Sequence, residues 1–287
     1  MRTAIFITAF IVISTVTAFL IRLSGEAKKA DSRDKIKSVE TNSLVKNRWD
    51  LPVILKEISG IDFLDQDRVA CIQDETGTIF IYNLRSSKIE KEIPFAGSGD
   101  YEGIALHGDD AYVLRSDGRI FQVGNFMTDP KVQEYSTFLT SKQDTEGLSL
   151  DKKNNRLLIS IKGYEPDQKD YKGIYAFNLS TRQLEKKPVF RIDLNDPQLE
   201  GFKKKKKASF NPSDIALHPQ KDEIYLIEGS KPKILLMDFS GKVKKVQEFD
   251  DADFSQPEGI AFAPDGGLYI SNEGKDKEGN ILQLSDF

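Results

Sequence analysis

Short apolar segments separated by turn-forming residues follow one another along most of the chain, and this pattern is typical of β-strands. The segment Gln256–Gly274, "QPEGIAFAPDGGLYISNEG", shows the unit. It consists of an acid and a glycine, an apolar run, a turn at "PDGG", a second apolar run and an acidic exit. The pattern predicts an all-β fold with almost no helix in this part of the chain.

The same unit recurs, and the spacing of its copies indicates the architecture. An acid or hydroxyl residue stands before the first apolar run of each copy, at Ser59, Glu102, Glu146, Asp214 and Glu258. Successive copies lie 43 or 44 residues apart, except for a step of 68 residues between Glu146 and Asp214. Repeats of this length with several short strands are typical of propeller blades. The sequence therefore predicts a five-bladed β-propeller.

Two features of the repeats concern the number of blades and the closure of the ring. The last copy ends at "NILQLSDF" with a third strand and no fourth, and Leu51–Ser59 has the polar and apolar pattern of an outer strand. We therefore expect Leu51–Ser59 to pair with Asn280–Leu284 and close the ring, which removes open sheet edges. A six-bladed ring is the alternative, if the segment 195–211 hides a degenerate strand pair. That segment is polar, and we interpret it as an insertion loop.

The N-terminal part of the chain has a different pattern. Ala4–Ile21 is an uninterrupted run of apolar and hydroxylated residues, flanked by Arg2 and Arg22. This predicts a hydrophobic helix in residues 1–24, which is either an uncleaved membrane anchor or a cleaved signal segment. Residues 25–48 are polar and without periodicity, and we expect a flexible linker there. The propeller domain is then residues 49–287.

This arrangement predicts a location. The chain is expected in the cell membrane, with a single N-terminal span and the propeller outside the cytoplasm, in the periplasm. Secretion after signal cleavage is the alternative.

Composition narrows the classes of function. The net charge is −4 with acids and bases mixed, which does not indicate nucleic-acid binding. Cys71 is the single cysteine, so neither an intramolecular disulfide nor a cysteine metal site can form. We expect a monomer.

The acids before the first strands are the candidate functional residues. In a propeller the first strand of each blade lines the central channel, so Glu102, Glu146, Asp214 and Glu258 should surround one mouth of it. The second strands end at the same face, and their ends supply the expected ligand-binding neighbours Asp74, Arg115, Lys162 and Asn272, together with Glu228 and Glu273. Carboxylates so close together repel one another, and a hard cation such as Ca²⁺ would relieve that repulsion.

Neighbouring cations offer a second way to relieve the repulsion. Glu102 has Arg115 on its own blade, and Glu146 has Lys162. The blades of Asp214 and Glu258 offer only acids or an amide at the corresponding place. We therefore expect the metal ligands to be Asp214 and Glu258, with Glu228 and Glu273 nearby. The alternative is that all these acids only stabilise turns before the strands.

Other candidate groups are weaker. His107 and His218 both end first strands, on the side away from the acids, and no nucleophile accompanies them. The run Lys203–Lys207 is typical of a solvated loop, with contact to anionic lipid or a polyanion as the alternative.

Leu51–Phe287 resembles the SdiA-regulated family of bacterial β-propellers, which are secreted or periplasmic. The motifs that carry the resemblance are "FAGSGDYEGIAL", "DTEGLSLD", "NPSDIALHP" and "QPEGIAFAPDGGLYISNEG". The resemblance implies a divalent-cation site at the axial acids Glu102, Glu146, Asp214 and Glu258. It also implies a fold similar to calcium-dependent propeller phytases and lactonases. This chain departs from the pattern at Ser59 and Lys162.

Three functions are consistent with these features. The first is a cell-envelope propeller that binds a divalent cation, calcium, and an unidentified small-molecule or protein ligand at the acidic mouth. The second is a metal-dependent hydrolase of phosphoesters, esters or lactones, although the sequence offers no evident general base. The third is a purely structural protein-interaction module.

Overall fold

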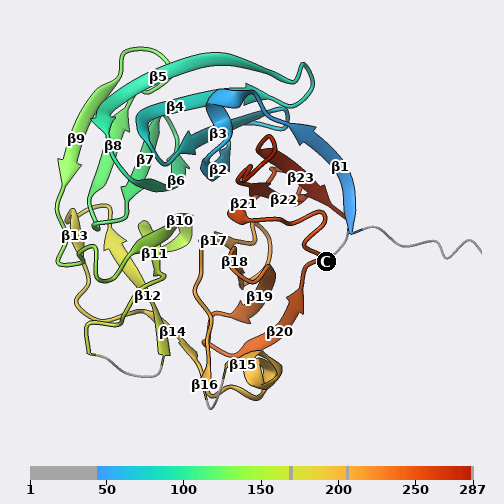
Figure 1. Ribbon diagram of the computed structural model, residues 1–287. Coiled ribbons are helices and arrows are strands. Elements are labelled where there is room, and N and C mark those ends of the chain that lie inside the picture. The colour runs from blue at the N-terminus through green and yellow to red at the C-terminus, as the bar shows by residue number, and fades with distance from the viewer. Residues whose placement is uncertain (1–43, 168–170, 205–206, 286–287) are drawn as a thin grey trace, which may run out of the picture. The chain divides into compact units, whose positions relative to one another are not determined.

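Four- or five-stranded antiparallel sheets are arranged as five blades around a central channel (Figure 1). A computed structural model describes residues 44–167, 171–204 and 207–285. The predicted five-bladed all-β fold is confirmed. Helix in the described residues is limited to three short 3₁₀ turns, which are η1 (Val53–Leu55), η2 (Lys152–Asn154) and η3 (Pro197–Phe202).

The first three blades follow chain order from the channel outwards. Blade 1 consists of β2 (Ile58–Phe63), β3 (Arg68–Gln73), β4 (Thr76–Asn83) and β5 (Lys88–Ser98). Blade 2 consists of β6 (Tyr101–His107), β7 (Asp110–Arg115), β8 (Ile120–Gly124) and β9 (Lys131–Tyr135). Blade 3 consists of β10 (Thr145–Asp151), β11 (Arg156–Ile161), β12 (Tyr171–Asn178), and both β13 (Gln183–Leu184) and β14 (Phe190–Asp193), which pair with β12.

The last two blades complete the ring. Blade 4 consists of β17 (Asp214–Leu217), β18 (Glu223–Glu228), β19 (Lys233–Asp238) and β20 (Val243–Glu248). Blade 5 consists of β21 (Pro257–Phe262), β22 (Leu268–Asn272), β23 (Asn280–Leu284) and the N-terminal strand β1 (Val45–Asp50). The inner strands β2, β6, β10, β17 and β21 surround the centre of the ring in Figure 1.

The hydrophobic core lies between successive blades. Each of the five clusters of buried side chains joins two neighbouring blades, and one of them joins blade 5 to blade 1 and so closes the ring. Second and third strands are buried on both faces, whereas the outer strand β9 is almost entirely exposed. The polar and apolar composition that marked outer strands in the sequence follows from this difference in burial.

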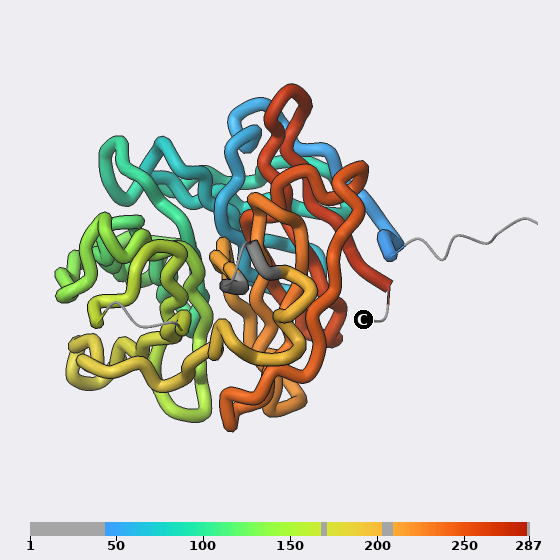
Figure 2. The backbone as a smooth tube through the Cα atoms, turned by 60° about the horizontal axis from the view of Figure 1, so that its bottom comes forward, coloured from blue at the N-terminus to red at the C-terminus, as the bar shows by residue number. Residues whose placement is uncertain are grey.

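The ring closes through an N-terminal strand, but the strand is not the one expected. β1, Val45–Asp50, pairs antiparallel with β23, and Figure 2 shows these first and last strands side by side. The prediction of Leu51–Ser59 for this role was wrong. Pro52 and η1 interrupt that segment, Leu51 and Leu55 are buried between blades 5 and 1, and Ile58 already belongs to β2.

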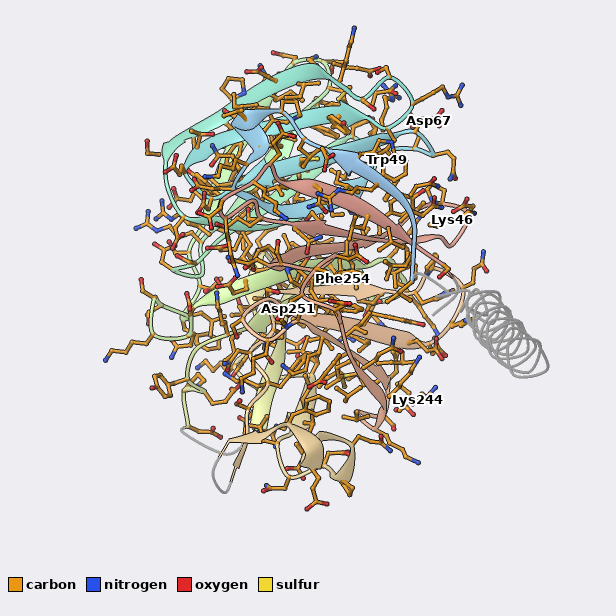
Figure 3. The ribbon with its side chains drawn as sticks, turned by 45° about the vertical axis from the view of Figure 1, so that its right-hand side comes forward. Lys46, Trp49, Asp67, Lys244, Asp251 and Phe254 are labelled. Atoms are coloured by element: carbon orange, nitrogen blue, oxygen red, sulfur yellow. The ribbon has the colours of Figure 1, made fainter. Side chains whose placement is uncertain are left out.

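β1 is anchored by its tryptophan. Trp49, labelled in Figure 3, donates a hydrogen bond from its indole nitrogen to the carbonyl of Leu84 at 2.8 Å, and its ring packs near that of Tyr269. The strand therefore begins inside the range 25–48, where the sequence predicted a linker.

The long step between the third and fourth copies does not add a blade in the described residues. It holds η3 and a hairpin of two-residue strands, β15 (Lys203–Lys204) and β16 (Lys207–Ala208). Leu199 and Phe210 of this insertion are buried in the core between blades 3 and 4. The insertion is thus more than a polar loop, since it covers one blade interface.

The hydrophobic segment Ala4–Ile21 lies outside the described residues. Within the part of the chain that the structure describes, no helix has the length and hydrophobicity needed to cross a membrane.

Candidate functional site

One mouth of the channel holds a small acidic cavity. Its volume is about 130 Å³, and residues from blades 1, 2, 3 and 5 line it. The lining residues are Glu57, Ile58, Ser59, Asp74, Glu102, Glu146, Lys162, Gln256, Glu258 and Glu273. Six of these carry carboxylates and one, Lys162, carries a positive charge. We call this cavity the acidic mouth.

A bulge at the start of an inner strand positions each of the central acids. The pairing register shifts between Tyr101 and Gly103 in β6, and again between Pro257 and Gly259 in β21. Glu102 in β6 and Glu258 in β21 therefore have no paired residue on the neighbouring strand. In β10 the register shifts in the same way at Glu146. A bulged residue leaves the ladder and its side chain is re-aimed, which here directs a carboxylate to the channel.

The glycine after each acid allows the inner strands to approach closely. A Cβ atom on Gly103 would lie 2.7 Å from the Cβ of Leu148 on the next blade. A side chain at that position would push the two blades apart, so the acid–glycine pair combines a bulge with close packing at the axis.

Burial and mutual repulsion raise the pKa values of these acids. Burial, then the neighbouring Glu146, raises the pKa of Glu102 to about 10. Burial raises the pKa of Glu146 to about 8, against the opposing effect of Lys162, whose ammonium lies 2.9 Å from a carboxylate oxygen of Glu146. Burial raises the pKa of Glu258 to about 7. The ion pair expected between Glu146 and Lys162 forms, and the charge of Lys162 also acts on Glu258, where it lowers the pKa against the effect of burial.

Two further acids lie beside these three. Burial, then the charges of Glu57 and Glu273, raises the pKa of Asp74 to about 6. The Oδ1 atom of Asp74 is buried and has no hydrogen-bond partner in the described residues. Burial also raises the pKa of Glu273, which accepts a hydrogen bond from the side chain of Gln256. A buried carboxylate oxygen in an acidic cavity can accept a hydrogen bond from a donor or coordinate a cation.

Asp214 does not lie at the acidic mouth, because its place in the repeat is shifted by one residue. The order Ser213-Asp214-Ile215 matches Glu102-Gly103-Ile104, so Asp214 occupies the glycine position. Its carboxylate is buried and accepts hydrogen bonds from three backbone N–H groups, those of Leu148 (3.2 Å), Ile215 (2.8 Å) and Ile260 (2.8 Å).

Glu228 is also placed away from the mouth. It forms a buried ion pair with Lys233 at 2.8 Å, and both side chains are almost fully buried, with 2% and 1% exposure. Lys233 itself lies over the rings of Phe202 and Phe210. The expectation that this blade carries no compensating cation was wrong, since Lys233 sits at the start of the next strand.

Arg115 and Asn272, which were also expected at the mouth, have other partners. Arg115 makes two hydrogen bonds to Asp117, at 3.0 and 2.7 Å, and is not among the residues that line the acidic mouth. The expected pairing of Arg115 with Glu102 was therefore wrong. Asn272 is buried, and its amide donates to the side chain of Asn280 at 3.0 Å.

Sequence reasoning missed two polar residues of the mouth, Glu57 and Gln256. Each stands two residues before the bulge position of its blade, at Ser59 and Glu258. This two-residue spacing identifies them only once Ser59 and Glu258 are known to be bulge positions.

The acids of the mouth form a loose group. Among residues 44–167, 171–204 and 207–285, no three Asp, Glu, His or Cys side chains are grouped so that they could hold a metal ion. Carboxylates nevertheless suit a hard cation that keeps part of its water shell, as Ca²⁺ commonly does. Glu102, Glu146 and Glu258 are the residues best placed to face such an ion.

Comparisons with known proteins agree with the fold. The model of the SdiA-regulated family matches residues 40–274. No curated protein sequence matches the chain significantly.

Solved structures share the architecture at low sequence identity. Glutaminyl cyclase from Myxococcus xanthus superposes with a TM-score of 0.57 at 16% identity, over 84% of this chain and 97% of that one. Virginiamycin B lyase from Staphylococcus aureus gives a TM-score of 0.45 at 15% identity, over 84% of this chain and 74% of that one. At this identity the likeness to the glutaminyl cyclase supports the fold alone.

Proposed function

Since this chain belongs to the SdiA-regulated family, we propose that it is a cell-envelope propeller that binds a calcium ion and a further ligand at the acidic mouth. The observation that carries the proposal is the excess of carboxylates in one small cavity. Glu102, Glu146 and Glu258 come from three different blades. Besides burial, Glu146 and Glu258 raise the pKa of Glu102, and Glu258 raises that of Glu146, while Lys162 is the one basic residue in the lining.

Calcium fits the chemistry of this lining. Hard cations of this kind take six to eight oxygen ligands, including carboxylates and waters. Because the acids are loosely grouped, the proposed ion keeps waters between itself and some of them. The orphaned oxygen of Asp74 would gain a partner in that hydration shell. A bound cation supplies positive charge that favours the ionised form of each acid.

The further ligand is expected to contact Lys162 as well as the cation. The side chain of Lys162 is 40% exposed although it pairs with Glu146, so its ammonium can still meet an anionic group. A ligand with a carboxylate or phosphate would then bridge the cation and Lys162. This arrangement orients the ligand over the channel without requiring any chemical step.

Calorimetric titration of the full chain with calcium chloride, after treatment with a chelator, tests the proposal. We expect binding that releases protons, because acids with raised pKa values must ionise to face the cation. Titration in two buffers of different ionisation enthalpy measures that release. Glu146→Gln and Glu258→Gln together should weaken binding by about tenfold or more, since each removes a charged ligand.

Glu92→Gln is the matched control, because Glu92 is an exposed acid on the outer strand β5. Its affinity for calcium should equal that of the wild type. Absence of binding at millimolar calcium, or equal binding by the double variant, would contradict the proposal.

A metal-dependent hydrolase is the second candidate function. The observation that favours it is the pKa of Glu258, which burial raises to about 7, so this carboxyl can accept or donate a proton near neutral pH. A panel of phosphoesters, esters and lactones, assayed with calcium and with a chelator, tests it. Turnover that is lost in Glu258→Gln would favour the enzyme over the binding protein.

We also propose that Ala4–Ile21 attaches a monomeric propeller to the membrane, outside the cytoplasm. The length and hydrophobicity of this segment support the proposal. Fractionation combined with protease treatment of spheroplasts tests it: the full-length chain should be in the membrane fraction and the propeller should be digested. Intact full-length protein in the soluble fraction would contradict it.

A further inference from the structure

The opposite end of the channel from the acidic mouth holds a second cavity, of about 200 Å³. Five half-buried apolar side chains, one from each inner strand and all at the same place in the repeat, form its rim. They are Phe63, Leu106, Leu150, Leu217 and Phe262. The lining also includes two polar side chains at one place in the repeat, Asp62 and Ser149, and Asp62 is the charged one. We call this cavity the apolar mouth.

We propose that the apolar mouth binds a small organic ammonium ion with an apolar body, such as an arylalkyl ammonium, whose charged group pairs with Asp62. This goes beyond the proposed function at the acidic mouth, because it concerns a separate cavity with different residues.

The carboxylate of Asp62 is held in a fixed position. Its Oδ1 atom accepts a hydrogen bond from the N–H of Phe63 and its Oδ2 atom from the N–H of Leu106, each at 2.7 Å. Each carboxylate oxygen can accept a second bond, so the group can still receive a donor from a ligand. Burial raises the pKa of Asp62 only to about 6, and it is therefore mostly ionised at neutral pH. No basic side chain among the described residues pairs with Asp62, so this half-buried carboxylate favours a cationic ligand.

The size and lining of the cavity determine which apolar group of a ligand can fit there. Beneath the rim the walls are Ile61, Ile104, Leu148, Ile215 and Ile260. An apolar cavity of about 150 Å³ lined by such residues is large enough for benzene. A cavity of about 200 Å³ therefore fits one six-membered ring with a short ammonium side chain.

Two aromatic side chains of the rim are held in place by their neighbours. The ring of Phe63 meets Tyr269 edge-on with a centroid distance of 4.7 Å. The ring of Phe262 meets Tyr225 at 5.0 Å and His218 at 4.8 Å. Rigid aromatic faces add to the attraction of an ammonium group through their negative ring surfaces. The rim is therefore preformed, as ligand pockets usually are.

Asp214 lies between the levels of the two mouths along the inner strands, since it occupies the glycine position, after the acids and before the residues of the apolar mouth. Its carboxylate bonds to the N–H groups of Leu148, Ile215 and Ile260. These residues line the inner end of the apolar mouth, while the acids of the other mouth precede them along the inner strands. Ligands at the two ends can thus be tested independently.

Calorimetric titration of the full chain with benzylammonium chloride, benzyl alcohol and sodium benzoate tests the proposal. The three compounds share a ring and differ in charge. We expect benzylammonium to bind about tenfold more tightly than benzyl alcohol, because a charged hydrogen bond is stronger than a neutral one, and benzoate not to bind. Equal affinity for the three compounds, or no binding of benzylammonium, would overturn the proposal.

Leu150→Lys is the decisive variant, since Leu150 is a half-buried residue of the rim and the lysine places a positive charge there. It should lower the affinity for benzylammonium by about tenfold or more. Val132→Lys adds the same charge on the exposed outer strand β9 and should bind like the wild type. Unchanged affinity in Leu150→Lys would place the ammonium elsewhere on the protein and would overturn the proposal. Asp62→Asn provides a second test, because this variant should bind benzylammonium and benzyl alcohol with equal affinity.

Discussion

The carboxylate of Asp214 joins three blades, because it accepts hydrogen bonds from backbone N–H groups of β10, β17 and β21. A sequence pattern alone groups Asp214 with Glu102 and Glu258, since all three precede an apolar run. A shift of one residue in a strand moves a side chain to the other face. The sequence therefore identified the acids of the repeat correctly but could not separate the structural acid from those of the mouth.

This difference gives a prediction about stability. Asp214→Ala removes the acceptor of three N–H groups and should lower the free energy of unfolding by roughly 3 kcal/mol. Glu258→Gln, measured in chelator, is the comparison and should be neutral or stabilising, because it relieves repulsion among the acids. Urea denaturation followed by circular dichroism measures both. Equal effects of the two substitutions would show that Asp214 has no special structural role.

The raised pKa values predict how stability depends on pH. Burial and neighbouring acids raise the pKa values of Glu102, Glu146 and Glu258 from 4.5 to about 10, 8 and 7. Between pH 5 and 8 the folded protein therefore binds more protons than the unfolded chain. The free energy of unfolding then falls as pH rises, by up to about 1.4 kcal/mol per pH unit for each such proton.

Denaturation at several pH values, with a chelator present, measures this slope. Glu102→Gln should flatten it, because glutamine resembles the protonated acid at every pH. Stability that rises between pH 5 and 8 would contradict the described environment of these acids.

At the scale of elements, the edge strand β1 shows why some strands cannot be predicted from the sequence. Inner strands were predicted well, since their apolar runs are buried on both faces. β1 lies at the edge of blade 5, and its sequence "VKNRWD" is mostly polar. Its stability depends on pairing with β23 and on the contact of Trp49 with Leu84, which lies on another blade. Such long-range contacts leave no local pattern, so the sequence favours the more apolar neighbouring segment Leu51–Ser59.

The closure by β1 predicts the effect of truncation. A chain that begins at Leu51 lacks β1, so it exposes the edge of β23 and loses the packing of Trp49. We expect a melting temperature lower by many degrees and a tendency to aggregate. A chain that begins at Leu44 keeps every strand of the ring and is the control. Scanning calorimetry of both chains measures the difference, and equal melting temperatures would contradict the closure.

For the whole molecule, the repeat length predicted the number of blades, because each repeat is one sheet that must pack against the next. The site was predicted only in part. Glu102, Glu146, Glu258, Glu273, Asp74 and Lys162 do meet at one mouth. Asp214, Glu228, Arg115 and Asn272 have other partners, which depend on strand register and on contacts between side chains far apart in the sequence.

The melting temperature of the full chain as a function of calcium concentration tests the central claim most directly. A ligand that binds only the folded protein stabilises it by about 2.7 kcal/mol at one hundred times its dissociation constant, which corresponds to a rise of about 5–10 °C for a domain of this size. We expect this rise in the wild type and in Glu92→Gln, and its loss when Glu102, Glu146 and Glu258 are all changed to glutamine. An unchanged melting temperature of the wild type at millimolar calcium, or an equal rise in the triple variant, would contradict a calcium site at the acidic mouth.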